Sequence, residues 1–236
     1  MTSTDILNQC AHVAQWLWQR QWAERNGGNM VALLPADADT EYRQLPPLSS
    51  PTPIGLSVPH LVGRHLYCKG SGCRMRDLAC APMDYGSIIR ILPDGQHYII
   101  VASHPILPTS ELASHLAIHN YLVASHSPHQ ATLHTHPHHL IALSHRLPSL
   151  SDLSDQLLSM MPETRLFVPR GIGIVPYLEP GSVALAQQTL AQLHHHDIVL
   201  WSQHGVLAVG PDMEEAFDTI DIMEKSARIL LLSQSR

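Results

Sequence analysis

Two histidines, His134 and His136, lie one residue apart in the run ATLHTHPHHLIALSH. In an extended strand, side chains two residues apart leave the same face of the sheet, so the two imidazoles would project side by side. Imidazole is a ligand for zinc, copper, iron and nickel, and a zinc ion with three protein ligands keeps a fourth position open for catalysis. Because the chain contains 18 histidines, a close pair can also arise by chance. The pair predicts a catalytic metal site if a third ligand lies nearby.

His204 is the candidate third ligand. It follows a buried-looking strand expected over residues 197–201, and it precedes Gly205 and another strand expected over 207–209. A histidine beside a glycine at the junction of two strands can approach a site closely, because glycine has no side chain to obstruct it. We therefore expect His204 to lie near the histidine pair.

Other histidines fit a metal site less well. The run His194-His195-His196 ends a helix expected over 182–196, where successive side chains point about 100° apart and cannot all bind one ion. We interpret this run as a helix cap. His115 and His119 share a helical face, but this spacing more often belongs to surface or interface histidines. Three further histidines are expected to face solvent or substrate: His138, His139 and His145.

Two glycine-rich turns could hold an anion. Asn26-Gly27-Gly28-Asn29 separates a helix expected over about residues 4–25 from a strand expected over 30–34, and Gly70-Ser71-Gly72 follows a strand expected over 65–68. Such turns expose backbone N–H groups, and their Asn and Ser side chains add donors. Together they could surround a phosphate if the fold brings them side by side. Each turn alone can also be an ordinary helix stop or loop.

Glu111 is a candidate catalytic carboxylate with an alternative structural role. It follows Pro108-Thr109-Ser110 at the start of an expected helix, in which Thr109 or Ser110 would be the N-cap. A carboxylate in the first turn of a helix is favoured by the unpaired N–H groups there and by the helix dipole. Its position therefore has a structural explanation even without chemistry.

The remaining chain alternates short apolar runs with amphipathic segments. Residues 85–103 predict a β-hairpin that turns at Pro93-Asp94-Gly95. The segment from Pro35 to Pro59 is rich in Pro, Ser, Asp and Thr, and it predicts an irregular loop. The N-cap of the first helix is expected at Thr4 or Asp5. Further strands are expected at 131–136, 166–168 and 172–176, and further helices at 138–145, 151–161 and from 211 onward.

Composition narrows the function classes. A chain of 236 residues with 44% hydrophobic content can bury a substantial core, and we expect one α/β domain. A formal charge of -6 gives no electrostatic footprint for nucleic acid or an anionic membrane surface, so we expect small molecules or further copies of the chain as partners. No apolar run approaches the length of a membrane span, and the N-terminus predicts an amphipathic helix, not a signal peptide. Four cysteines without C-x-x-C spacing favour a reducing cytoplasm.

Six stretches, in the expected order and spacing, resemble the class II aldolase and adducin family, and most closely its rhamnulose-1-phosphate aldolase branch. They run from about Trp22 to Leu231: WAERNGGNM, GSG, PTSEL, LHTHPHHLIAL, GIGIVP and VLWSQHGVLAVGPDMEEAFDTIDIMEKSARIL. The resemblance implies a single three-layer α/β/α domain over residues 1–236, with a central, mostly antiparallel sheet. It also implies a homotetramer with active sites between subunits.

The resemblance also assigns site residues. The family's zinc-binding histidines fall on His134, His136 and His204, which implies one Zn²⁺ per subunit, and its catalytic acidic residue falls on Glu111. A second carboxylate, contributed by a neighbouring subunit, matches Glu163 across a one-residue gap. The family's phosphate contacts fall on the two glycine turns and the residue before Glu111: Asn26, Gly28, Asn29, Ser71, Gly72 and Ser110.

The activity implied by the resemblance is reversible cleavage of L-rhamnulose 1-phosphate to dihydroxyacetone phosphate and L-lactaldehyde. Zinc would stabilise the enediolate left on the dihydroxyacetone phosphate fragment, and Glu111 would act as acid and base. An L-fuculose-1-phosphate aldolase, a pentulose-phosphate 4-epimerase and a methylthioribulose-1-phosphate dehydratase on the same scaffold are alternatives. A non-catalytic adducin-like interaction module is another, although a scaffold has no physical need for three histidines and Glu111.

Overall fold

A single sheet of nine strands crosses the part of the chain that the computed structural model describes, residues 2–36, 42–102, 105–146 and 152–234. The strand order is β2-β5-β4-β3-β1-β6-β9-β8-β7. Neighbouring strands are antiparallel except β7 and β8, which are parallel, so the expected mostly antiparallel sheet is confirmed. The strands are β1 (Asn29–Leu33), β2 (Thr52–Pro53), β3 (His65–Lys69), β4 (Gly86–Ile91), β5 (His97–Ala102), β6 (Ala131–Thr135), β7 (Ile172–Val175), β8 (Ile198–Trp201) and β9 (Gly205–Gly210).

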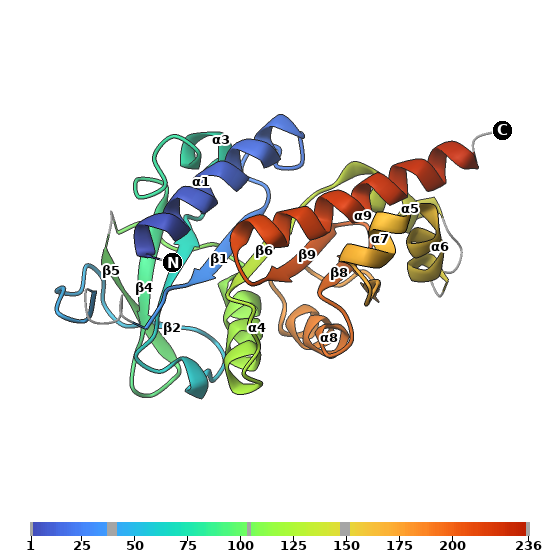
Figure 1. Ribbon diagram of the computed structural model, residues 1–236. Helices are drawn as coiled ribbons and strands as arrows, with labels where there is room; N and C mark the ends of the chain where they lie inside the picture. Colours follow the sequence, from blue (N-terminus) through green and yellow to red (C-terminus); the bar gives the residue numbers. More distant parts are fainter. Residues whose placement is uncertain (1, 37–41, 103–104, 147–151, 235–236) are drawn as a thin grey trace.

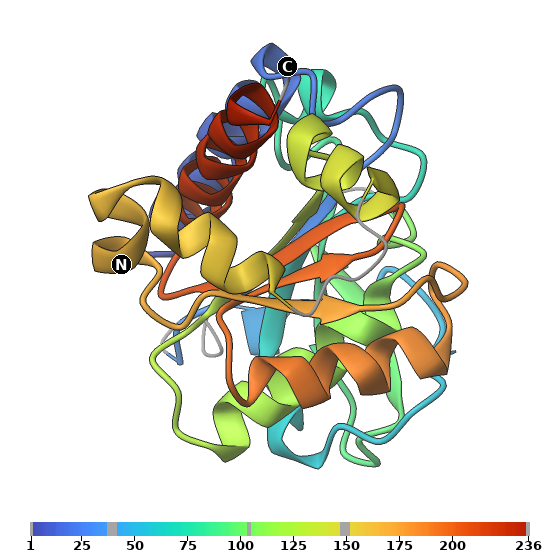
Figure 2. The ribbon, with the colours of Figure 1, turned by 90° about the vertical axis from the view of Figure 1, so that its right-hand side faces the viewer.

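Helices lie on both faces of the sheet, which gives the expected three layers (Figures 1 and 2). Helices α1 and α9 pack together on one face, and α4 and α8 pack together on the other. Helices α5, α6 and α7 contact α9. The helices are α1 (Ser3–Gln19), η1 (Pro59–Leu61), α3 (Met75–Leu78), α4 (Leu112–Ala124), α5 (His138–Arg146), α6 (Leu153–Met160), α7 (Pro162–Phe167), α8 (Val183–Leu193) and α9 (Met213–Ser233).

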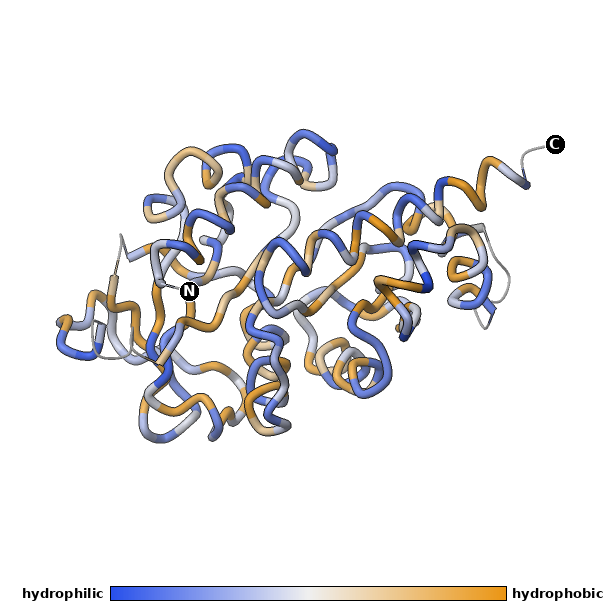
Figure 3. The backbone as a smooth tube through the Cα atoms, viewed as in Figure 1, coloured by the Kyte–Doolittle hydropathy of each residue, from blue (hydrophilic) through white to orange (hydrophobic). Residues whose placement is uncertain are grey.

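The central strands are apolar on both sides because both sides are covered. Along β1, Met30 and Ala32 belong to the hydrophobic cluster that includes α1 and α9, whereas Val31 and Leu33 belong to the cluster that includes α4. In Figure 3 the strands are largely hydrophobic, while the helices alternate between hydrophilic and hydrophobic residues. A continuous apolar strand between amphipathic helices therefore fixes the middle layer of the fold.

The first helix is shorter than the sequence predicted. It starts after Thr2, which forms a capping box with Asp5, and not after Thr4 or Asp5. It ends at Gln19, and the next residues reverse direction through a positive φ of 61° at Gln21. Trp22 leaves the helix as a result, and its carbonyl oxygen accepts the Thr135 hydroxyl (2.6 Å) and the His136 N–H (2.9 Å). This turn therefore fixes the chain beside the end of β6.

Two further expectations are wrong. Residues 166–168 were expected to form a strand, but 162–167 form α7, in which Leu166 is 70% exposed and Phe167 62%. A run of three apolar residues is too short to reveal its period. The expected loop between Pro35 and Pro59 contains the short edge strand β2, where Pro53 is tolerated because an edge strand leaves one side unpaired. Residues 37–41, 103 and 151 of the expected elements lie outside the described residues.

All four cysteines are free: Cys10, Cys68, Cys73 and Cys80. Among the described residues, no helix combines the length and the hydrophobicity that crossing a membrane requires.

Candidate active site

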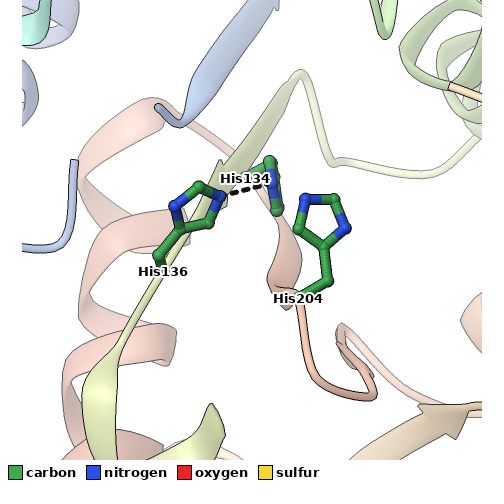
Figure 4. Close-up of side chains that lie close together, drawn as sticks. All are labelled: His134, His136 and His204. Carbon is green, nitrogen blue, oxygen red and sulfur yellow. Dashed lines mark hydrogen bonds between the residues drawn. The ribbon is translucent and has the colours of Figure 1, made fainter. Parts of the chain in front are cut away.

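The structure brings His134, His136 and His204 together, as the sequence predicted. His134 lies in β6, His136 follows it, and His204 lies in the turn between β8 and the adjacent β9. One ring nitrogen from each of the three lies within 4.8 Å of the others, and in Figure 4 the imidazoles surround a common space. The Nε2 atoms of His134 and His136 are 3.2 Å apart. This donor set could hold one metal ion.

The other ring nitrogens of the pair are held by acceptors. His134 Nδ1 lies 2.8 Å from the carbonyl oxygen of Val206, and His136 Nδ1 lies 2.8 Å from a carboxylate oxygen of Glu24. A ring nitrogen facing such an oxygen carries the proton, so Nε2 keeps its lone pair for a cation. The His204 ring stacks on Trp201, with 5.3 Å between centroids. The rings are therefore oriented before any ligand binds.

Gly205 allows His204 to approach the pair, as expected. A Cβ atom at this position would lie 2.5 Å from the Thr135 carbonyl oxygen and 2.9 Å from the His134 ring.

Burial also suits the histidines to bind a cation. It lowers the pKa of His134 well below its ordinary value and lowers that of His204 to about 4, with nearby His136 adding to both shifts. Both rings are neutral at pH 7, which is the form that binds metal.

Glu111 faces the histidines from the start of α4. It is the N-cap residue of α4 and has no side-chain capping bond, so the predicted caps at Thr109 and Ser110 are wrong. Its Oε2 atom lies 3.9 Å from His134 Nε2, and its Oε1 atom lies 4.0 Å from His204 Nε2. Burial raises the pKa of the Glu111 carboxyl, although a hydrogen bond from Asn29 and nearby positive charges oppose the shift. A carboxyl with a raised pKa beside a metal site suits proton transfer.

One cavity of about 160 Å³ joins these groups to both glycine turns. The Asn26–Asn29 turn enters β1, which pairs with β6 on one side and with β3 on the other, so the second turn, at the end of β3, lies nearby. The cavity is lined by Asn26, Gly27, Gly28, Asn29, Lys69, Ser71, Gly72, Thr109, Ser110, Glu111, His134, His136 and His204. Every residue predicted for the phosphate and the metal is in this set.

Comparison with known proteins agrees with this geometry. Residues 8–231 match the sequence profile described as Class II Aldolase and Adducin N-terminal domain. The chain belongs to the class II aldolase and adducin family. It is 48% identical to a rhamnulose-1-phosphate aldolase of Bacteroides thetaiotaomicron, over 97% of this chain and 86% of that protein. It is 33% identical to one from Pectobacterium atrosepticum, over 93% and 82%.

Solved structures of class II aldolases share the fold. A sugar-phosphate aldolase from Thermotoga maritima is 32% identical, with a TM-score of 0.85 over 99% of this chain and 97% of that one. A structure described as L-fuculose 1-phosphate aldolase has a TM-score of 0.67 at 17% identity, which shows the fold alone. The three-layer fold is thus the fold of this aldolase family.

The expectation that His115 and His119 are surface or interface histidines is wrong. His115 and His119 are fully buried and lie neither on the surface nor at an interface. Asn29 donates from Nδ2 to Glu111 Oε2 (2.9 Å), and its Oδ1 accepts a hydrogen bond from His115 Nε2. His115 Nδ1 then accepts the Thr132 hydroxyl at 2.6 Å. These bonds connect Glu111 to the core, so Asn29 orients the carboxylate besides lining the phosphate region.

Two charged groups at the site escaped sequence reasoning. Glu24, which lies 112 residues before His136 in the sequence, contacts its ring, and Lys69 lines the cavity from the end of β3. A lysine that ends an otherwise apolar strand, directly before a glycine turn, is the signal that could have identified Lys69. Glu163, by contrast, is exposed on α7 and does not line this cavity.

Proposed function

We propose that this class II aldolase is zinc-dependent and reversibly cleaves L-rhamnulose 1-phosphate into dihydroxyacetone phosphate and L-lactaldehyde. The observation that carries the proposal is one cavity in which Glu111 lies about 4 Å from two of three convergent histidines and which both glycine turns line. The 48% identity to a rhamnulose-1-phosphate aldolase supports the choice of sugar.

The donor set fits zinc. His134, His136 and His204 would hold the ion through ring nitrogen atoms. Zinc binds nitrogen ligands well, whereas magnesium and calcium prefer sites made entirely of oxygen ligands. When bound, the ion supplies Lewis-acid stabilisation of the negative charge that develops on the substrate. With three protein ligands, a position stays open for that purpose. Zinc, one ion per chain, is the cofactor that we propose.

Glu111 would transfer the proton at carbon. As the C3–C4 bond breaks, the C4 hydroxyl loses its proton and C4 becomes the aldehyde carbon; the bonding electrons stay on the three-carbon fragment, which must take up a proton at C3 to become dihydroxyacetone phosphate. In the reverse direction the same proton is removed. Burial raises the pKa of Glu111, which makes the carboxylate a better proton acceptor than an exposed one. The hydrogen bond from Asn29 fixes the direction in which it points.

The glycine turns would hold the substrate's phosphate group. The side chains of Asn26, Asn29, Ser71 and Ser110 line the same cavity as the histidines and would provide donors, together with the backbone N–H groups of Gly28 and Gly72. Anchoring the phosphate places the carbons that react next to the metal site and Glu111. We assign this function to Asn26, Gly28, Asn29, Ser71, Gly72 and Ser110.

We further propose a cytoplasmic homotetramer of single-domain chains with active sites between subunits. Helix α7 exposes Leu166 and Phe167 beside Glu163, and adjacent exposed apolar side chains mark surfaces that bind other proteins. A neighbouring subunit's cavity could receive Glu163 as a second acid or base. Four free cysteines fit a reducing compartment.

A panel of sugar phosphates tests the proposal. Release of dihydroxyacetone phosphate is measured with L-rhamnulose 1-phosphate and L-fuculose 1-phosphate, dehydration with a methylthioribulose 1-phosphate, and epimerisation with a pentulose 5-phosphate, each with and without chelator. We expect the fastest, chelator-sensitive cleavage with L-rhamnulose 1-phosphate. Faster conversion of another sugar would reassign the substrate. Absence of any turnover, together with less than one metal ion per chain after zinc loading, would favour a non-catalytic module.

A further inference from the structure

Lys69 is a buried lysine in the wall of the active-site cavity. It is one of only two lysines in the chain and is 2% exposed. Its ammonium donates a hydrogen bond to the carbonyl oxygen of Asn26 at 3.1 Å. An ammonium group has three N–H donors. A buried cation with one hydrogen bond to a neutral carbonyl has donors and charge available for an anion.

The position of Lys69 connects the segments that line the phosphate side of the cavity. Its side chain reaches the first glycine turn at Asn26, and its own backbone leads directly into the second turn, at Gly70. Its carbonyl oxygen accepts the N–H of Thr109 (2.9 Å), two residues before Glu111. Any anion held between the two turns would therefore lie close to this ammonium.

Lys69 is also the single Lys or Arg among the described residues that line the cavity. The other groups proposed to hold the phosphate are uncharged hydrogen-bond donors, which would leave its negative charge uncompensated. Burial lowers the pKa of Lys69 to about 8, while electrostatic interactions with Cys73 and Glu111 oppose that shift. A buried ammonium whose charge is only partly compensated is stabilised further when an anion binds beside it.

We propose that Lys69 is the counter-ion of the substrate's phosphate group, to which its ammonium donates a hydrogen bond from between the two glycine turns. This inference rests on the proposed function, since it takes the anion in the cavity to be the phosphate monoester of a ketose phosphate. It assigns Lys69 to binding and not to covalent catalysis.

Binding of inorganic phosphate tests the inference without turnover. Calorimetry is performed on the zinc-loaded full chain, on Lys69→Met, which keeps the length of the side chain but removes its charge, and on Lys225→Met. Lys225 is the other lysine and is exposed on α9, so it is a matched control. We expect Lys69→Met to bind phosphate about 10- to 100-fold more weakly, and the control to bind as wild type does. Equal affinity in both variants would overturn the proposal.

A second measurement uses the unaltered Lys69 side chain and does not depend on whether Lys69→Met folds. With two lysines in the chain, lysine-selective ¹³C labelling gives two signals to assign, and Lys225→Arg identifies the signal of Lys69. Titration should give a pKa for Lys69 of about 8 in the free protein and a higher pKa in saturating phosphate, because a bound anion stabilises the ammonium. The same pKa with and without phosphate would overturn the proposal.

Steady-state kinetics separates this inference from the proposed function. In the aldol cleavage assay, Lys69→Met should raise KM about 10- to 100-fold and retain kcat. A fall in kcat at unchanged KM, or covalent labelling of Lys69 by borohydride with dihydroxyacetone phosphate, would assign it to the chemistry and overturn the inference. If the wild-type protein cleaves no ketose 1-phosphate while phosphate binding still depends on Lys69, the proposed function fails and the counter-ion assignment stands.

Discussion

Lowering the pH from 7 to 5 should destabilise the protein through His115 and His119, the two buried histidines of α4. Burial lowers the pKa of His115 to about 3 and that of His119 to about 4. In the unfolded chain a histidine has a pKa of about 6.5, so below that pH the unfolded chain binds protons that the folded chain does not. The stability contributed by the neutral rings is therefore full above pH 6.5 and is lost as the pH falls towards the folded-state pKa. At pH 5 the loss is about 2 kcal/mol for each histidine.

The variant His119→Gln isolates one of these contributions. Nε2 of His119 lies 3.3 Å from the Val31 carbonyl oxygen and 3.2 Å from the Thr132 hydroxyl, and the glutamine amide can donate there without titrating. Between pH 7 and 5 this variant should lose about 2 kcal/mol less stability than wild type.

Urea unfolding at the two pH values, with chelator present so that metal release does not contribute, measures this difference. His60→Gln is the control, because His60 is an exposed histidine outside the site. The control should lose as much stability as wild type. Equal losses in His119→Gln and wild type would show that His119 is protonated in the folded chain, which would refute the reasoning.

Three substitutions address the site directly. Glu111→Gln should keep the fold and the metal but lower kcat about 100- to 10,000-fold, because an amide cannot transfer the proton; unchanged cleavage would remove Glu111 from that role. His204→Ala should release zinc to a chelator far more readily than wild type. If this variant retains zinc as tightly as wild type, His204 is not the third ligand. Glu24→Gln should weaken zinc binding about 10-fold or more, because His136 Nδ1 would lose its carboxylate partner; competition with a chromogenic chelator measures the change, and an unaltered zinc affinity would make that contact irrelevant to the metal.

The cluster of three histidines was predictable because each histidine carries a signal in its own neighbouring residues. His134 and His136 follow the two-residue period of a strand, and Gly205 marks the close approach of His204. Glu24 and Lys69 were missed because their roles depend on contacts between distant segments, with His136 and with Asn26. No spacing along the chain encodes either pair.

The fold was predictable where a segment was long enough to show its period. The strands other than β2 and the long helix α9 were expected close to their observed positions, since apolar residues repeat over several turns or along whole strands. Helix α7 was mistaken for a strand over a run of three residues. The end of α1 was misplaced because a glutamine, Gln21, and not a glycine, adopts the positive φ of the helix's C-terminal turn, in which the Trp22 N–H donates to the Leu17 carbonyl oxygen.

The buried histidines show a different limit. The sequence placed His115 and His119 on one face of α4, which is correct, but it did not show that this face packs on the sheet. Polar side chains are usually exposed unless they are paired. Their partners, Asn29 and Thr132, lie on neighbouring strands, so only the folded chain reveals that the pairing exists.

The most direct test of the central claim is the rate of dihydroxyacetone phosphate release from L-rhamnulose 1-phosphate as zinc is returned to metal-stripped protein. The account predicts that the rate is negligible at first, rises linearly with added zinc, and stops rising at one ion per chain. A rate that is unaffected by stripping the metal, or a chain that binds one zinc ion through the three histidines and still releases no product, would contradict it.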